Sequence, residues 1–322
     1  QVMLINKTQV IYERRVNFVA FVSMPDGQYI VSFDEDDMVR LWDFKGKPHN
    51  SIRPFKIPNN SVIALSKNGK YIVSGHQDGT LQRWDLNGNR ISQPFPMHES
   101  EHEFDSKVLS IAVSHNGRYI VSSSRESVQL WDLNTNSKKE IFKEAKVEGY
   151  PLVTLSLSTN DDYIVGGQAN PQTDDVSGGM RLWYIDKEIE STTFQVHTRA
   201  ISKVQVSANS EYILSGVMDG TIKVVNKFGN LITQYQYSGG SIALSPDNSY
   251  VVGNSGGEIR IFDLKGTLIG DREFKYPEFQ NIPTFYKTVS SPDDKYIISN
   301  SKALNLRDRK GQILLSFKEK TV

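Results

Sequence analysis

The chain has no cysteine. This absence excludes disulfide bonds, thiolate metal sites and a thiol nucleophile, and it is typical of a reducing compartment, so we expect a cytoplasmic protein. The sequence also lacks a P-loop, a dinucleotide-binding glycine motif and a G-x-S-x-G motif placed between a strand and a helix. It therefore predicts no enzyme class, no catalytic residue and no cofactor.

Net charge and long apolar runs are absent as well. The 37 basic side chains balance the 37 acidic ones, so composition gives no reason to expect nucleic acid or an anionic membrane as a partner. No apolar run reaches the ~20 residues that span a bilayer, and Lys7, Glu13, Arg14 and Arg15 make the N-terminus unlike a signal peptide. Because the chain begins with Gln1 rather than Met, we expect it to be part of a longer protein.

The sequence does contain a repeated pattern, which is a tyrosine, two aliphatic residues and then Ser or Gly. The spacings of 42, 48, 44, 49, 38 and 46 residues lie around the ~40–45 residues of a four-stranded propeller blade. The seven copies are Tyr29-Ile-Val-Ser, Tyr71-Ile-Val-Ser, Tyr119-Ile-Val-Ser, Tyr163-Ile-Val-Gly, Tyr212-Ile-Leu-Ser, Tyr250-Val-Val-Gly and Tyr296-Ile-Ile-Ser.

Each copy has the same surroundings. An alternating segment such as Val108-Leu-Ser-Ile-Ala-Val-Ser and a turn rich in Asn, Asp and Gly precede the tyrosine, and two further strand patterns separated by a turn follow it. Four short strands per repeat, without helical periodicity, predict an all-β protein, a seven-bladed β-propeller with four antiparallel strands per blade. The tyrosine strand is apolar throughout, which predicts that it is buried on both faces between neighbouring blades.

The repeat also predicts the domain organisation. Residues 1–15 form an N-terminal segment, and residues 16–322 form the propeller, with blades at approximately 16–58, 59–104, 105–148, 149–198, 199–236, 237–282 and 283–322. Residues 8–12 and 312–317 both have the pattern of an outer strand. Either 8–12 pairs outside blade seven as a closing strand, or the C-terminal strand fills that place and residues 1–15 are a linker.

The third strand of several repeats ends in an aromatic residue and an acid. Trp42-Asp43, Trp84-Asp85 and Trp131-Asp132 stand where WD40 repeats carry their signature pair, and the chain resembles the WD40 family as found in bacterial multidomain proteins. Phe262-Asp263 and Trp183-Tyr184 match in part. The resemblance covers nearly the whole chain and implies a non-catalytic propeller.

The resemblance also implies that a blade is held by a hydrogen-bonded tetrad. Its members are a Trp, a strand Ser or Thr, a His in the connection that leads into the blade, and an Asp six residues before the Trp. On this basis we assign structural roles to Trp42, Asp78, Trp84, His98, Trp131, His197, Ser215 and Asp219. No blade has all four members, so we expect apolar packing between blades to dominate stability, with about 1 kcal/mol from each surviving hydrogen bond.

Two patterns suggest chemistry at first sight. His98-Glu-Ser-Glu-His102 satisfies the H-E-x-x-H spacing of zinc proteases, but only a one-turn helix fits there and no third ligand follows. Asp34-Glu-Asp-Asp37 and Asp174-Asp175 occupy turns, where acids are ordinary. We interpret these segments as solvated loops and predict no metal site.

In the resembled fold, one rim of the disc gathers the connections into each blade and the turns between second and third strands; we call it the upper rim. The other two kinds of turn form the lower rim. The acids expected on the upper rim are Asp34, Glu35, Asp36, Asp37, Glu99, Glu101, Glu103, Asp105, Glu144, Glu148, Asp174 and Asp175. The basic residues expected on the lower rim are Lys45, Lys47, Lys67, Lys70, Arg118, Lys138, Lys139, Lys187, Lys227, Lys265 and Lys310.

Two long insertions also fall on the upper rim, at residues 168–179 and 274–286, and the second is rich in aromatic residues. We therefore expect a protein or peptide partner, cationic in character, on the acidic upper rim. The residues that we assign to partner binding are Asp36, Glu101, Asp175, Tyr276, Phe279 and Tyr286.

The sequence thus favours a non-catalytic interaction platform or sensor domain. We expect a monomeric domain of a larger bacterial signalling or scaffold protein, with neither nucleic acid nor membrane as a partner. Two alternatives remain: a metal-dependent hydrolase or lyase in the central channel, and a sensor that binds a peptide or small ligand at the channel mouth.

Overall fold

The computed structural model is built from strands. No helix long and apolar enough to span a bilayer occurs in the part of the chain that it describes. That part comprises residues 16–24, 27–34, 36–57, 62–66, 68–96, 98, 106–143, 152–168, 178–185, 191–217, 220–236, 241–255, 258–272, 288–291, 293, 295–300 and 304–317.

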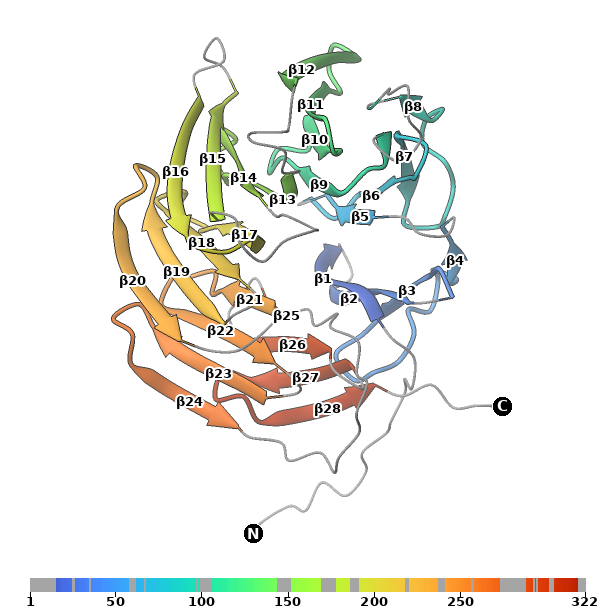
Figure 1. The fold of residues 1–322 in the computed structure, drawn as a ribbon. Coiled ribbons are helices and arrows are strands. Elements are labelled where there is room, and N and C mark those ends of the chain that lie inside the picture. The colour runs from blue at the N-terminus through green and yellow to red at the C-terminus, as the bar shows by residue number, and fades with distance from the viewer. Residues whose placement is uncertain are drawn as a thin grey trace.

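The strands form seven sheets of four antiparallel strands each, arranged around a central axis (Figure 1). Blade 1 contains β1 (Val16–Met24), β2 (Gly27–Asp34), β3 (Met38–Trp42) and β4 (Phe55–Lys56). Blade 2 contains β5 (Val62–Leu65), β6 (Tyr71–Gly75), β7 (Thr80–Asp85) and β8 (Phe95–Pro96). Blade 3 contains β9 (Ser110–Val113), β10 (Tyr119–Ser123), β11 (Ser127–Asp132) and β12 (Ser137–Lys143). Blade 4 contains β13 (Leu152–Leu157), β14 (Tyr163–Gln168), β15 (Gly178–Tyr184) and β16 (Ser191–His197).

The remaining blades repeat this arrangement. Blade 5 contains β17 (Ile201–Val206), β18 (Tyr212–Val217), β19 (Thr221–Asn226) and β20 (Leu231–Gln236). Blade 6 contains β21 (Ser241–Leu244), β22 (Tyr250–Ser255), β23 (Glu258–Asp263) and β24 (Leu268–Arg272). Blade 7 contains β25 (Thr288–Ser290), β26 (Tyr296–Asn300), β27 (Leu304–Asp308) and β28 (Ile313–Phe317). The predicted fold, a seven-bladed β-propeller with four antiparallel strands per blade, is confirmed.

The turn between the first and second strands follows a rule that the tyrosine motif alone did not reveal. In blades 2 to 7 a serine stands five residues before the motif tyrosine, and its hydroxyl accepts a hydrogen bond from the tyrosine backbone N–H; examples are Ser114 with Tyr119 at 2.7 Å and Ser207 with Tyr212 at 2.8 Å. This local bond closes the turn and fixes the register of the two strands.

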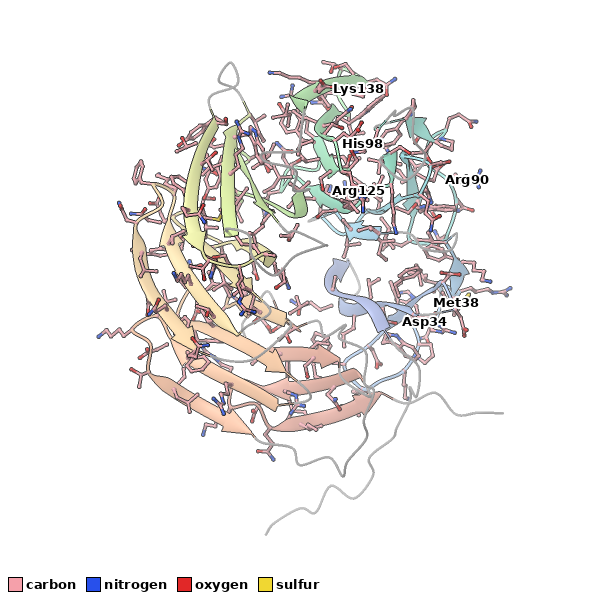
Figure 2. All side chains as sticks on the ribbon, in the orientation of Figure 1. Asp34, Met38, Arg90, His98, Arg125 and Lys138 are labelled. Atoms are coloured by element: carbon pink, nitrogen blue, oxygen red, sulfur yellow. The ribbon has the colours of Figure 1, made fainter. Side chains whose placement is uncertain are left out.

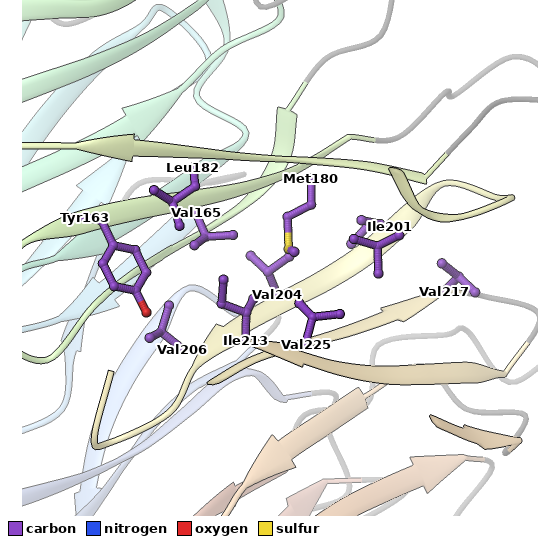
Figure 3. Close-up of a cluster of buried hydrophobic side chains, with 11 residues drawn as sticks. Tyr163, Val165, Met180, Leu182, Ile201, Val204, Val206, Ile213, Val217 and Val225 are labelled. Carbon is purple, nitrogen blue, oxygen red and sulfur yellow. The ribbon is translucent and has the colours of Figure 1, made fainter. Parts of the chain in front are cut away.

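The second strand of each blade is buried on both faces, as predicted. Every residue of β6 and β10 is buried. The two aliphatic residues after each tyrosine point to opposite neighbours: Ile164 packs with blade 3 and Val165 with blade 5, and Figure 3 shows the Val165 side of this arrangement. Each motif therefore contributes to two interfaces between blades.

The ring closes by the same packing. The last described strand, β28, pairs with β27 and takes the fourth position of blade 7, so the C-terminal strand occupies the outer position there. Residues 8–12, the other candidate for that position, lie outside the described residues. Blades 7 and 1 meet in a cluster in which Ile298 and Leu306 contact Ile30 and Trp42.

The motif tyrosines also join blades through their hydroxyl groups. Tyr71 donates a hydrogen bond to the carbonyl of Gly117 in blade 3 at 2.9 Å, and Tyr163 donates to the carbonyl of Ser210 in blade 5 at 2.7 Å. Burial raises the pKa of Tyr71 to about 12. Each of these bonds holds the first turn of the following blade.

The seam between blades 7 and 1 predicts a large effect of Leu306→Ala. Leu306 is 2% exposed, and truncating a buried leucine costs about 2–5 kcal/mol through lost burial and a cavity. Leu314→Ala is the matched control because Leu314, on the adjacent strand, is 48% exposed; we expect a change within about 0.5 kcal/mol. Denaturant unfolding measures both, and equal effects would contradict closure through this cluster.

The interblade hydrogen bond predicts that Tyr163→Phe lowers the free energy of unfolding by about 1–3 kcal/mol, since the buried carbonyl of Ser210 loses its donor. Tyr212→Phe is the control, because the hydroxyl of Tyr212 makes no hydrogen bond in the described part of the chain. Denaturant titration compares the two variants, and an unchanged midpoint for Tyr163→Phe would count against this contact.

Candidate interaction surface

The turns between second and third strands lie against the connections into the next blade, which together form the upper rim. His98 donates its backbone N–H to the carbonyl of Gly79 at 3.2 Å, and Val108 donates to the carbonyl of His76 at 3.1 Å. Gly79 has φ +81°, and a Cβ there would lie 2.1 Å from the carbonyl oxygen of His98. The sequence therefore needs glycine at this point of the rim.

In blade 1 the upper rim is organised by a buried carboxylate. Asp34 is fully buried, and its Oδ1 accepts hydrogen bonds from the backbone N–H groups of Asp36 at 2.9 Å and Met38 at 3.0 Å. Arg40 forms an ion pair with its other oxygen. Burial raises the pKa of Asp34, while these hydrogen bonds and Arg40 oppose the rise. Figure 2 shows Asp34 and Met38 at this turn.

Asp36 is the one residue assigned to partner binding that the structure describes. It is half-buried, and its backbone is fixed by the bond to Asp34. The other five, Glu101, Asp175, Tyr276, Phe279 and Tyr286, lie outside the described residues, as do most of the two insertions that carry four of them. The acidic upper rim therefore stays a prediction over much of its length.

In blade 2, hydrogen bonds join Trp84, Ser74 and His76, and the sequence analysis had not assigned His76 to this group. Trp84 donates from Nε1 to Ser74 Oγ at 2.8 Å, and Ser74 Oγ lies 3.0 Å from Nε2 of His76. Burial lowers the pKa of His76, and the negative charge of Asp78 opposes this shift. The histidine comes from the turn after the second strand, not from the connection before the first. In the sequence, the position of His76 two residues before Asp78 was the feature that could have identified it.

Asp78 has a second role in the same turn. Its Oδ1 accepts hydrogen bonds from the backbone N–H of Thr80 at 3.0 Å and from the Thr80 hydroxyl at 2.7 Å. The side chain of Asp78 is exposed. The acid assigned a structural role thus also presents negative charge on the upper rim.

Blade 3 uses His98 differently. The ring is 2% exposed, with Nδ1 2.7 Å from Ser127 Oγ and Nε2 2.9 Å from Ser122 Oγ. Burial lowers the pKa of His98 to about 4. Both ring nitrogens are engaged by serine hydroxyls, which leaves neither as a metal ligand in this arrangement. Trp131 packs on Phe95 of blade 2, with ring centroids 4.7 Å apart.

In several blades, the serine of the tyrosine motif forms a hydrogen bond with a Trp, His or Arg side chain. In blade 1, Trp42 Nε1 donates to Ser32 at 2.9 Å; in blade 5, His197 Nε2 lies 2.8 Å from Ser215 Oγ. In blade 7 the tryptophan position holds Arg307, which is 1% exposed and donates from Nε to Ser299 at 2.9 Å. Asp219, the remaining residue of the assigned structural set, lies outside the described residues.

The lower rim differs from its predicted basic character. Its lysines and arginines stand beside carboxylates, and the sequence analysis grouped the cations without them. The hydrogen bond and charge of Arg118 hold the pKa of Asp132 at about 2. The ion pairs are Arg118–Asp132 at 2.6 Å, Lys227–Glu211 at 3.2 Å, Lys295–Asp293 at 3.4 Å and Arg309–Asp247 at 3.3 Å. Of the cations predicted for this rim, Arg118 and Lys227 thus stand in ion pairs, so the described lower rim carries acids of the third strands and turns as well as cations.

Within the described residues, no three His, Asp or Glu side chains gather as ligands for a metal ion. In the H-E-x-x-H segment, His98 has its ring nitrogens on Ser127 and Ser122, while residues 99–102 lie outside the described residues.

The buried ring of His98 predicts an acid-dependent loss of stability. Its pKa is about 4 in the folded chain against an ordinary 6.5, so the unfolded chain binds more protons between these values. The contribution of His98 to the free energy of unfolding is fully present above about pH 6.5. It is lost as the pH drops towards 4, and the loss is about 3 kcal/mol at most. Unfolding of wild type and His98→Asn across this range isolates the contribution.

The exposed His115 provides the control for that experiment. His115→Asn should keep the wild-type slope of unfolding free energy against pH, whereas His98→Asn should flatten it. Parallel curves for wild type and His98→Asn would show that His98 is not the group responsible.

Comparison with protein families agrees with this geometry. The WD domain, G-beta repeat model matches residues 8–43, 50–85, 96–132 and 189–226. No match was found among curated proteins. The second and fourth matches span the outer strand of one blade and the first three strands of the next, and the third match begins at the last residue of β8 and spans the first three strands of blade 3. Together with the seven four-stranded blades and the Trp–Ser bonds of blades 1 and 2, these four repeat matches are consistent with the WD40-repeat family.

Proposed function

We propose that this propeller is a non-catalytic platform that binds a cationic protein or peptide on its upper rim. WD40 propellers typically mediate protein interactions and are generally non-catalytic. The observation that carries the proposal is the fixed turn of blade 1, where the Asp34 carboxylate holds the backbone of Asp36 and Met38. A site whose backbone is fixed before binding loses little conformational entropy when a partner docks.

The acids on the described upper rim support a partner of positive charge. These acids are Asp36, Asp78 and Glu126, the last of which follows the second strand of blade 3. Arg125, Lys107 and Arg199 are cations of the same rim in the described part of the chain. Negative groups on one rim steer a cationic partner and raise its association rate at low salt. The role fits one domain of a cytoplasmic signalling or scaffold protein.

Charge reversal tests this function. We expect E101R/D175R to lower partner recovery in affinity purification from native lysate by about tenfold, since two attractive carboxylates become repulsive cations. Recovery is measured by quantitative mass spectrometry at low and at physiological salt.

The matched control is E140R/E211R, which makes the same change in net charge at exposed positions away from the upper rim. The control should retain the wild-type partners. Equal recovery by all three proteins, or equal loss in both variants, would overturn the assignment of the upper rim.

A further inference from the structure

The innermost strands of the seven blades surround the axis of the propeller and are almost free of charge. As the structure describes them, β1, β5, β9, β13, β17, β21 and β25 carry a single charged side chain, Lys203 of β17. Lys203 is half-buried. Its ammonium group forms no ion pair or hydrogen bond in the described part of the chain.

The neighbouring interfaces show what normally stands at this position. Ser110 of β9 accepts a hydrogen bond from the backbone N–H of Leu155 in blade 4 at 3.0 Å. Thr154 of β13 accepts one from Val204 in blade 5 at 3.3 Å. A hydroxyl on one innermost strand thus accepts a hydrogen bond from a backbone N–H at the free edge of the next innermost strand.

Strand register places Lys203 in the same position. Thr154 pairs with Gly167 and Lys203 with Gly216, each directly after an irregularity in its strand. The amide that corresponds to Val204 in the next interface is that of Ile242, which pairs with Gly253 as Val204 pairs with Ser215. An ammonium group only donates hydrogen bonds. Lys203 therefore brings a donor to an edge where its equivalents bring an acceptor.

Gln205 adds a further donor beside it. Lys203 and Gln205 are two residues apart on one strand and share one face of it. The Oε1 atom of Gln205 accepts the backbone N–H of Leu244 at 3.3 Å, which orients the side chain towards blade 6. Its Nε2 group donates no hydrogen bond in the described part of the chain. Three donors, from Lys203, Gln205 and Ile242, then converge without a carboxylate on these innermost strands.

We propose that Lys203 and Gln205 form a binding site for one carboxylate at the propeller axis, between blades 5 and 6. One ammonium group balances one carboxylate, whose two oxygens accept from the ammonium and from the amide donors. A phosphate dianion would need a second cation, and β17 supplies only one. The carboxylate comes either from a small free acid or from a glutamate, aspartate or C-terminus of a partner.

The pKa of Lys203 agrees with an amine that has no anionic partner among the described residues. Burial lowers this pKa to about 8, because no described anion stabilises the charged form. A carboxylate in the site raises the pKa again, and at pH 8 a rise of one unit lowers the uncharged fraction from about a half to about a tenth. The uncharged amine is the form that reacts with acylating reagents.

Competitive acetylation of all lysines, followed by peptide mass spectrometry, tests the site at pH 8. The probes are sodium acetate and the peptide acetyl-Gly-Ala-Glu-Ala-Gly-amide, compared with sodium chloride at equal ionic strength and with the corresponding Gln peptide. We expect about fivefold slower labelling of Lys203 with a carboxylate probe and no change at Lys139, which is exposed on β12. Protection by acetate identifies a free acid, and protection by the Glu peptide alone identifies a partner carboxylate.

Two variants test the site further, and the melting temperature adds a readout that does not depend on labelling. Lys203→Thr copies Thr154 and Gln205→Ala copies Ala112, the residues at these positions in blades 4 and 3. The carboxylate probe that protects Lys203 should raise the melting temperature of wild type and of Lys139→Thr above the chloride value, but not that of Lys203→Thr, and Gln205→Ala should lower the protection of Lys203. Protection by chloride equal to that by both carboxylate probes, or equal protection of Lys139, would overturn the site. The rim variant E101R/D175R should keep the protection, which separates this site from upper-rim binding.

Discussion

Two-sided burial of the second strand is the constraint on which this structure depends. Each sheet is covered on both faces by its neighbours, so the strand in the middle of the sheet has no polar face. In blade 3, Ile120 packs towards blade 2 and Val121 towards blade 4. Because successive residues of a strand point to opposite faces, two adjacent aliphatic residues are the shortest sequence that serves two interfaces. The ring closes on the same principle at Ile298 and Ile30.

Polar groups inside this apolar ring are arranged around one serine. The motif serine accepts from an indole in blades 1 and 2, meets a histidine in blades 2, 3 and 5, and accepts from a guanidinium in blade 7. These partners differ in shape: the indole and the guanidinium donate an N–H to the buried hydroxyl, whereas the imidazole nitrogen meets it as donor or acceptor according to its tautomer. A buried polar group must form a hydrogen bond, but more than one kind of side chain can provide it. This explains why the side chain that meets the motif serine differs among blades 1, 2, 3, 5 and 7, whereas blades 4 and 6 have Gly166 and Gly253 at the serine position.

The two rims and the axis divide the surface of the propeller into regions of different chemistry. The described upper rim has a fixed turn at Asp34 and the exposed acid Asp78, whereas on the lower rim Arg118 and Arg309 pair with carboxylates from neighbouring turns. Such exposed pairs contribute little to stability, but they neutralise the field of that rim. On the innermost strands that the structure describes, the axis carries one lysine, Lys203. A partner that binds the upper rim and extends a carboxylate towards the axis would use both regions, although the two sites are defined by separate residues.

The sequence by itself determined the repeat, the number of blades and which strand is buried, because these follow from periodicity and from the alternation of side chains along a strand. It also located Asp36, His98 and His197, whose positions follow from spacing. It did not determine which groups meet between repeats. In blade 2, His76 comes from an unexpected turn; on the lower rim, Arg309 of blade 7 pairs with Asp247 of blade 6; and strand register places Lys203 at the position that Thr154 holds in blade 4. These contacts join residues about 40–60 positions apart, or depend on the path of a turn, and only the closed ring brings such residues within hydrogen-bonding distance.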